Sequence, residues 1–173
     1  MINKDFFKKI RILDGGMGQE LLARGMKPNS TLWSANAILD ENYHQLVLDT
    51  HIDFIKAGAE IIVTTTFATR QKRLKENNLL DKFEYLNQKA GEIAQTAKRK
   101  FPNTYIAGGI PPQNLTYEAD DRDEVEITEN FNSQAKALNP YVDFFYFDVW
   151  SSVKEVKCGI CLLYTSDAAD EDL

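Results

Sequence analysis

The chain has 173 residues, of which 43% are hydrophobic and 27% charged, and its formal net charge is −6. This length suits one domain, and the composition is that of an ordinary globular protein. The acidic balance argues against nucleic acid and anionic membrane surfaces as partners, because both favour a basic patch. No apolar run approaches the roughly 20 residues that a membrane helix needs, and the charged start lacks the apolar stretch of a signal peptide. The two cysteines, Cys158 and Cys161, form no disulfide framework, which favours a reduced, cytoplasmic setting.

Short β-branched or aromatic runs alternate with amphipathic segments along the chain. Gly25 and Gly58 stand where a glycine would end the first two helices, and Ser151-Ser152 would cap the last one. Such alternation predicts an α/β fold with a parallel sheet and crossover helices. Strands are expected over 10–14, 60–67, 104–110 and 142–147, and helices over 17–24, 43–57, 83–100, 124–138 and from 153 onward.

Each expected strand ends in glycine or polar residues: 14–16, 64–66, 108–109 and 148. Ligands of parallel α/β proteins bind at the carboxyl ends of the strands. These four ends therefore mark one candidate binding face.

The glycine-rich segment 12–21 requires a phosphate-binding loop to be considered. A GxGxxG loop would need glycine at Leu21, and no Gly-Lys-Ser/Thr follows. The spacing does not support a nucleotide site.

Segment 12–21 instead resembles the opening signature of the homocysteine S-methyltransferase family. The resemblance continues, in family order and spacing, through 31–34, 51–60, 62–67 and 142–155. It implies a (βα)8 TIM barrel, truncated here after about four βα units, so that residues 1–160 form the N-terminal half of a homocysteine-binding barrel. The implied reaction is zinc-dependent methyl transfer to homocysteine, giving methionine, with a sulfonium, ammonium or methylated folate donor.

Residues 161–173 do not fit this pattern. Segment 161–170 has no amphipathic period and resembles the translation of a transposase mosaic-end sequencing adapter. We therefore expect 161–173 to be a non-native tail; an acidic disordered tail is the alternative.

By resemblance, seven residues contact the amino-acid substrate. Asp14 would pair with the substrate ammonium; the alternative is an aspartate that caps the following turn. For Trp33, the alternative to lining the pocket is covering the barrel rim. Asp148 stands where the family usually has glutamate, so it keeps the charge with a shorter reach. The seven residues are Asp14, Gly15, Trp33, Ser34, Thr64, Phe67 and Asp148.

Zinc would supply the homocysteine thiolate, because a free thiol is mostly protonated near neutral pH. By resemblance its three cysteine ligands lie on the sixth and eighth strands, and Cys158 follows the fourth. The sequence thus predicts no metal ligand and no catalytic residue in this chain, with zinc bound only by the intact protein. His51 is expected to have a structural, hydrogen-bonded role.

Two alternatives to the homocysteine enzyme remain. One is a methyltransferase of the same barrel that acts on another small thiol, which Asp148 suggests. The other is a non-catalytic or truncated amino-acid-binding module. In each case the partners are small molecules, and a half barrel should dimerise, aggregate or fold poorly because its sheet edges are open.

Overall fold

The computed structural model describes residues 2 and 5–168, with side chains described as far as residue 160. From β1 onward, helices separate the strands as predicted, but the short helices α2 and α4 were not predicted. The described strands are β1 (Ile61–Val63), β2 (Tyr105–Ile110) and β3 (Phe144–Phe147). The described α-helices are α1 (Met17–Ala23), α2 (Asn36–Leu39), α3 (His44–Lys56), α4 (Gln71–Glu76), α5 (Phe83–Lys100), α6 (Glu124–Leu138) and α7 (Val153–Ala168), and the 3-10 turns are η1 (Phe6–Lys8), η2 (Trp33–Ala35), η3 (Glu41–Tyr43), η4 (Leu80–Lys82) and η5 (Asn139–Tyr141).

The three described strands form one parallel sheet in the order β1-β2-β3. Ile62 lies opposite Ile106, and Ala107 lies opposite Phe144. Neighbouring parallel strands require a helical crossover, and α5 and α6 provide it. The predicted parallel α/β arrangement is therefore confirmed.

The strand expected over 10–14 is not a regular strand. Leu13 forms a single parallel bridge with Ile61, and Ile10 is 96% exposed. Ile12 accepts hydrogen bonds from the backbone N–H groups of Glu60 and Ile61, and Asp14 donates one to Ile61. The segment thus follows the β1 edge of the sheet, but among the described residues nothing pairs with its other side.

The strand expected over 60–67 is also shorter than predicted, because β1 ends at Val63. The Thr66 N–H turns back to the Thr64 carbonyl at 2.7 Å, a three-residue turn. The threonines that suggested strand by their β-branching instead form the loop that leaves the sheet.

Helix prediction succeeded where local signals were strong. The bounds expected for α5 and α6 agree with the structure. Gly25 and Gly58 follow α1 and α3 with φ of 102° and 113°, in the left-handed region that suits a glycine after a helix. The Ser152 hydroxyl accepts from the Glu155 N–H at the start of α7, as a capping serine does.

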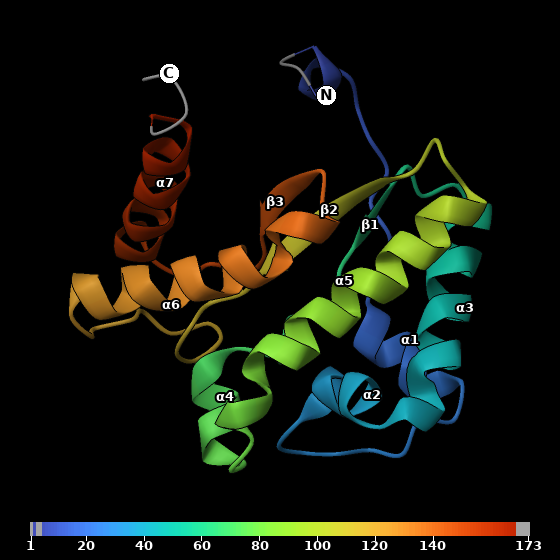
Figure 1. The fold of residues 1–173 in the computed structure, drawn as a ribbon, viewed down its shortest axis with the longest axis horizontal. Helices are drawn as coiled ribbons and strands as arrows, with labels where there is room; N and C mark the ends of the chain where they lie inside the picture. The colour runs from blue at the N-terminus through green and yellow to red at the C-terminus, as the bar shows by residue number, and fades with distance from the viewer. Residues whose placement is uncertain (1, 3–4, 169–173) are drawn as a thin grey trace.

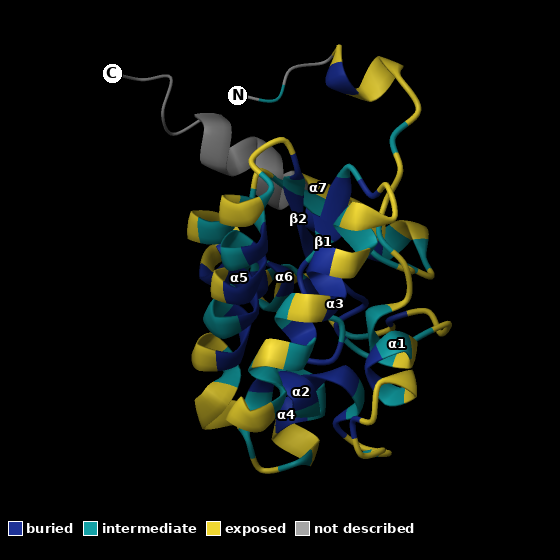
Figure 2. Ribbon diagram, turned by 90° about the vertical axis from the view of Figure 1, so that its right-hand side faces the viewer, coloured by how far each residue is buried: buried dark blue, intermediate teal, exposed yellow. Residues whose placement is uncertain are grey.

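The helices α3, α5 and α6 cover one face of the sheet (Figure 1). Figure 2 shows β1, β2 and the inward sides of these helices as buried and their outward sides as exposed. Side-chain direction along β3 alternates, so Phe145 and Phe147 pack with α6 residues while Phe144 and Tyr146 face the opposite side.

A second, smaller apolar cluster covers this opposite face of the sheet. Phe6 in η1 packs against Tyr105 at a ring distance of 4.5 Å and against Phe144 at 6.2 Å. Several members of this cluster, including Val63 and Tyr146, are only partly buried. Figure 1 shows η1 at the end of the sheet away from α2 and α4.

The domain boundary expected at residue 160 falls inside α7, whose backbone continues to Ala168. The side chains of 161–168 and all of 169–173 lie outside the described residues, so the tail remains a prediction.

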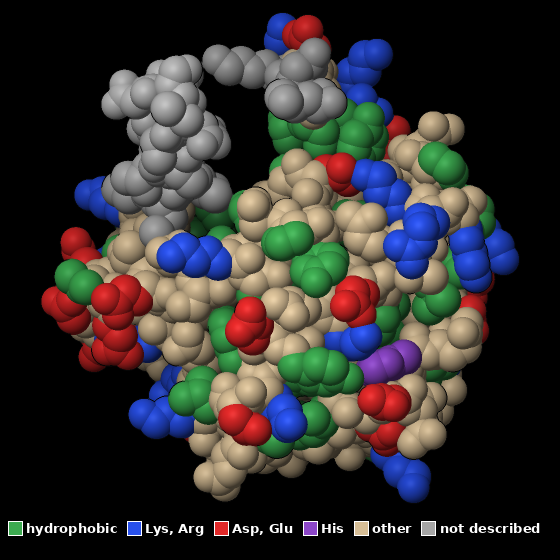
Figure 3. Space-filling view, viewed as in Figure 1, with side chains coloured by type: hydrophobic (Ala, Val, Ile, Leu, Met, Phe, Trp, Pro, Cys, Tyr) green, Lys and Arg blue, Asp and Glu red, His purple; other side chains and the backbone are tan. Residues whose placement is uncertain are grey.

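Within the described part of the chain, no helix is both long and apolar enough to cross a membrane. Acidic and basic side chains are interspersed over the face shown in Figure 3.

Candidate active site

One cavity of about 350 Å³ lies at the carboxyl ends of the strands, beside α1. All seven residues predicted to contact the substrate line it: Asp14, Gly15, Trp33, Ser34, Thr64, Phe67 and Asp148. The fold therefore brings together side chains from four segments separated by up to 134 positions. Their predicted roles in binding remain predictions. The other lining residues are Leu13, Gly16, Met17, Gly18, Gln19, Val63, Thr65 and Tyr146.

Asp14 is the most buried acid of the cavity, with its side chain 4% exposed. Its Oδ2 accepts the backbone N–H of Val63 at 2.9 Å, across the gap between the first segment and β1. Burial raises the pKa of Asp14 from 3.8 to about 7, and Asp148 adds a smaller repulsive contribution. Asp14 does not act only as a local turn cap, because its bond joins two distant segments.

Tyr146 in β3 and Asp148, directly after it, also line the cavity. Burial raises the pKa of Asp148, and burial together with the two carboxylates raises the pKa of Tyr146. None of the residues that line the cavity is a lysine, arginine or histidine. The site thus has two acids and no cation of its own, which suits a ligand with a positive charge.

Tyr146 was missed by the sequence analysis, although a signal for it exists. Residues 144, 146 and 148 lie on one face of a strand with a period of two. Once Asp148 was assigned to the site, Tyr146 should have been assigned with it.

Thr64 lines the cavity, but its hydroxyl is already engaged. It accepts the Gly109 N–H at 3.0 Å and lies 2.8 Å from the Thr66 hydroxyl, which reaches the Gly109 carbonyl at 2.7 Å. These bonds tie the loop after β1 to β2. A methyl at Gly109 would lie 2.8 Å from Val63 Cγ1, so glycine permits this close approach.

Trp33 forms another wall and has a left-handed backbone, with φ of 49°. Its indole lies against Gly18, where an added Cβ would come within 2.5 Å of Nε1. Val149, directly after Asp148, also has a positive φ of 61°. Such strained positions occur frequently at binding sites, where the surrounding fold holds them.

His51 lies behind the cavity on α3 and is completely buried. Its Nε2 is 3.5 Å from the Thr65 hydroxyl, and its Nδ1 is 3.8 Å from Asp14 Oδ2 without a hydrogen-bond partner among the described residues. Burial lowers its pKa from 6.5 to about 4, so the ring is neutral at physiological pH. The hydrogen bonding expected of His51 is thus limited to the long contact between its Nε2 and Thr65 among the described residues.

A buried amide network holds the loop between β1 and α4 in place. Gln134 Nε2 on α6 donates to the Thr66 carbonyl at 3.1 Å and to Asn87 Oδ1 at 3.1 Å. Gln134 Oε1 accepts from Gln113 at 2.8 Å, and the Thr69 hydroxyl donates to Asn87 at 2.8 Å. The network therefore connects the loop that carries Phe67 to α5 and α6.

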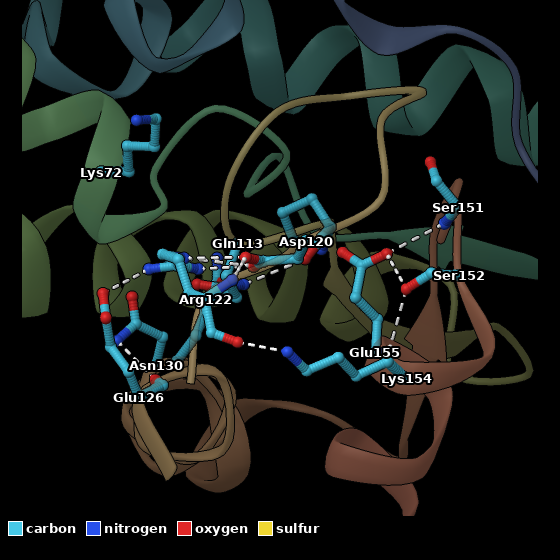
Figure 4. Close-up of polar contacts among 12 residues, drawn as sticks. Lys72, Gln113, Asp120, Arg122, Glu126, Asn130, Ser151, Ser152, Lys154 and Glu155 are labelled. Atoms are coloured by element: carbon cyan, nitrogen blue, oxygen red, sulfur yellow. Dashed lines mark hydrogen bonds and ion pairs between the residues drawn. The ribbon is translucent and has the colours of Figure 1, made fainter. Parts of the chain in front are cut away.

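A second cavity, of about 450 Å³, lies between α4 and α6. Four of its five charged lining side chains form ion pairs, Lys72 with Glu76 and Arg122 with Glu126, and Arg122 also pairs with the buried Asp120. Figure 4 shows Arg122 between these two acids and Glu155 bound to Ser151 and Ser152. Because most of these charges are already paired, we place the candidate site in the first cavity, which the predicted contact residues line.

No group of three or more potential metal ligands exists among the described residues. Cys158 is a buried free thiol packed with Ile110 and Phe131, away from the first cavity. The described side chains thus do not form the zinc site that the family resemblance implies.

Residues 11–169 match the homocysteine S-methyltransferase family, and the chain belongs to it. The site geometry agrees with this assignment, since the residues predicted from the family resemblance to contact the substrate share one cavity.

Among curated relatives, homocysteine S-methyltransferase 2 of Saccharomyces cerevisiae is 28% identical over 87% of this chain and 52% of its own length. Homocysteine S-methyltransferase 2 of Zea mays is 35% identical over 60% of this chain and 30% of its own length. Selenocysteine Se-methyltransferase of Brassica oleracea var. italica is 35% identical over 52% of this chain and 26% of its own length. The chain thus spans about half the length, or less, of these relatives.

The metallated form of the homocysteine methyltransferase MmuM from Escherichia coli superposes with a TM-score of 0.82 at 21% identity, over 95% of this chain and 62% of that protein. The oxidized form of the same protein gives a TM-score of 0.79 at 22% identity, over 90% of this chain and 58% of that protein. This similarity shows a shared fold.

Proposed function

We propose that this chain forms the amino-acid-binding part of a homocysteine S-methyltransferase with a (βα)8 barrel. The observation that carries the proposal is the pair Asp14 and Asp148, which face one cavity that has no lining cation. An amino-acid ammonium group would stabilise the negative charge of this pair, whereas a ligand without one would leave the two neighbouring acids in mutual repulsion.

In the proposed reaction, the homocysteine sulfur attacks the donor methyl group as a thiolate. Zinc supplies that thiolate when it is bound, and in this proposal its cysteine ligands lie on later strands that are not in this chain. The described residues orient the substrate: Asp14 and Asp148 hold its ammonium group, and Trp33 and Phe67 cover its apolar part. The isolated chain is expected to bind the amino acid without transferring a methyl group.

Calorimetric titration of the chain with L-homocysteine tests this proposal, with 4-mercaptobutyrate, which lacks the ammonium group, as the control ligand. Binding of homocysteine only, weakened at least tenfold by Asp14→Asn, is expected because a charge-assisted bond contributes about 1.5–3 kcal/mol. Equal binding of the two ligands would contradict the proposal. Zinc-dependent methionine formation by this chain would contradict its expected inactivity.

A second acceptor is favoured by two observations. Asp148 has a shorter reach than the glutamate expected there, and the Brassica relative is a selenocysteine Se-methyltransferase. Parallel titrations with L-cysteine and L-selenocysteine distinguish the acceptors, and tighter binding of either than of homocysteine would favour this alternative.

A further inference from the structure

His51 lies next to the Asp14 carboxyl group and does not line the cavity. The ring is completely buried, and its Nδ1 is 3.8 Å from Asp14 Oδ2. A buried polar nitrogen without a partner is costly, and Nδ1 has none among the described residues. At 3.8 Å the contact is too long for a hydrogen bond, although such contacts in unliganded sites often shorten once ligand is bound.

The tautomer of His51 decides whether this contact attracts. With a proton on Nδ1, the ring donates toward Asp14 while Nε2 accepts from the Thr65 hydroxyl at 3.5 Å. With a proton on Nε2, the Nδ1 lone pair faces the carboxylate and repels it. Only the first tautomer is attractive when Asp14 is ionised.

We propose that His51 is a positioning residue for Asp14, whose ionised carboxylate it holds toward the cavity through Nδ1–H. The Val63 N–H already fixes Oδ2 at 2.9 Å, so the imidazole supplies a second donor to a carboxyl group that has little solvent. The other acidic groups near Asp14 are Asp148 and Tyr146, from the end of β3. Asp148 disfavours the negative charge of Asp14, which makes a second donor useful.

This inference rests on the proposed function only in taking the ligand to carry an ammonium group. At a pH above its pKa of about 7, an Asp14 carboxylate held by two donors is already oriented when such a ligand arrives. His51 would then affect ligand affinity without touching the ligand.

The first test needs no ligand. In the full wild-type chain at about pH 8.5, above the pKa of Asp14, the ¹⁵N shifts of His51 should show the Nδ1–H tautomer. The Nε2–H tautomer under these conditions would overturn the proposal, whatever the chain binds.

The second test compares His51→Asn with His51→Leu. The asparagine amide retains a donor near the Nδ1 position, whereas leucine has a similar bulk and no donor. Leucine should raise the pKa of Asp14, followed by ¹³C NMR of its carboxyl carbon, by about one pH unit, and asparagine should largely restore it. An unchanged Asp14 pKa in His51→Leu would show that His51 only packs against its neighbours, which would overturn the proposal.

Homocysteine affinity provides the last readout. It should fall about tenfold in His51→Leu and recover in His51→Asn. If wild-type chain fails to bind homocysteine, the proposed function fails while the tautomer and the Asp14 titration still decide the role of His51.

Discussion

Asp14 has an acidic side chain that is almost fully buried and close to a second acid. Burial and the second acid both disfavour its negative charge. Its bond to the Val63 N–H holds the side chain in place, but burial dominates and raises its pKa from 3.8 to about 7. The group is therefore poised to change charge near neutral pH. A ligand with a positive charge would favour the ionised form.

Replacing Asp14 by asparagine should change how stability depends on pH. Because the folded-state pKa is raised, the contribution of Asp14 to the free energy of unfolding is complete below about pH 3.8 and is lost as the pH rises through about 7. Asp14→Asn should remove this loss. Urea unfolding at several pH values between 4 and 8 measures the difference between variant and wild type.

His51 also makes stability depend on pH in this range, in the opposite direction. Because its pKa is lowered to about 4, its contribution to the free energy of unfolding is lost as the pH falls from 6.5 toward 4. His51 is present in both wild type and Asp14→Asn, so its contribution should cancel to first order in the difference between them. Parallel stability curves would show that Asp14 is not buried as described.

Gly18 determines where the Trp33 indole lies. Gly18→Ala places a methyl 2.5 Å from Nε1 and 2.9 Å from Cε2, so the indole must move. We expect a shifted tryptophan emission and a loss of about 1–3 kcal/mol in unfolding free energy, as is typical of overpacking. Gly16→Ala is the control, because nothing lies within 4 Å of its added methyl, and it should leave the emission unchanged.

At the scale of elements, the site depends on a loop that has no regular structure of its own. Residues 64–69 leave β1 early and are held by hydroxyl and amide bonds to β2, α5 and α6. The loop that carries Phe67 is therefore positioned by its neighbours.

Gln134→Leu should loosen this loop. The substitution removes the donor to the Thr66 carbonyl and the acceptor of Gln113, both in a buried region. A loss of about 2 kcal/mol in unfolding free energy is expected, measured by urea unfolding. Glu129→Leu, at an exposed position of the same helix, should stay within about 0.5 kcal/mol of wild type. Equal effects of the two substitutions would show that the amide network contributes little.

At the scale of the molecule, three helices cover one face of the sheet, and among the described residues Phe6 of the N-terminal segment packs on the other face. Phe6 shields part of this second face, yet Phe7 remains 59% exposed and Val63 and Tyr146 are partly buried. Among the described residues, the outer edge of β3 has no strand beside it. Open strand edges and apolar faces favour association between molecules.

The isolated chain is therefore expected to self-associate as its concentration rises, which sedimentation velocity would measure. Phe144→Lys, on the second face, should weaken the association, whereas Val125→Lys, on the exposed side of α6, should not. A monomer at every concentration would contradict this expectation.

Local signals in the sequence were sufficient for the three described strands and for five of the helices, but not for the short helices α2 and α4. The bounds of α5 and α6 follow from their apolar periodicity, and the ends of α1 and α3 follow from Gly25 and Gly58, because these features act within a few residues. The blocks of family resemblance also selected seven residues that line one cavity.

Contacts between distant segments determined the rest. Segment 10–14 is not a regular strand because it pairs on one side only, and β1 ends at Val63 because Thr66 bonds to Gly109 on β2. The raised pKa of Asp14 arises from burial by residues far along the chain, and Trp33 takes its place because Gly18 lacks a side chain there. Such effects depend on which surfaces meet in space, and periodicity within one segment carries no information about that.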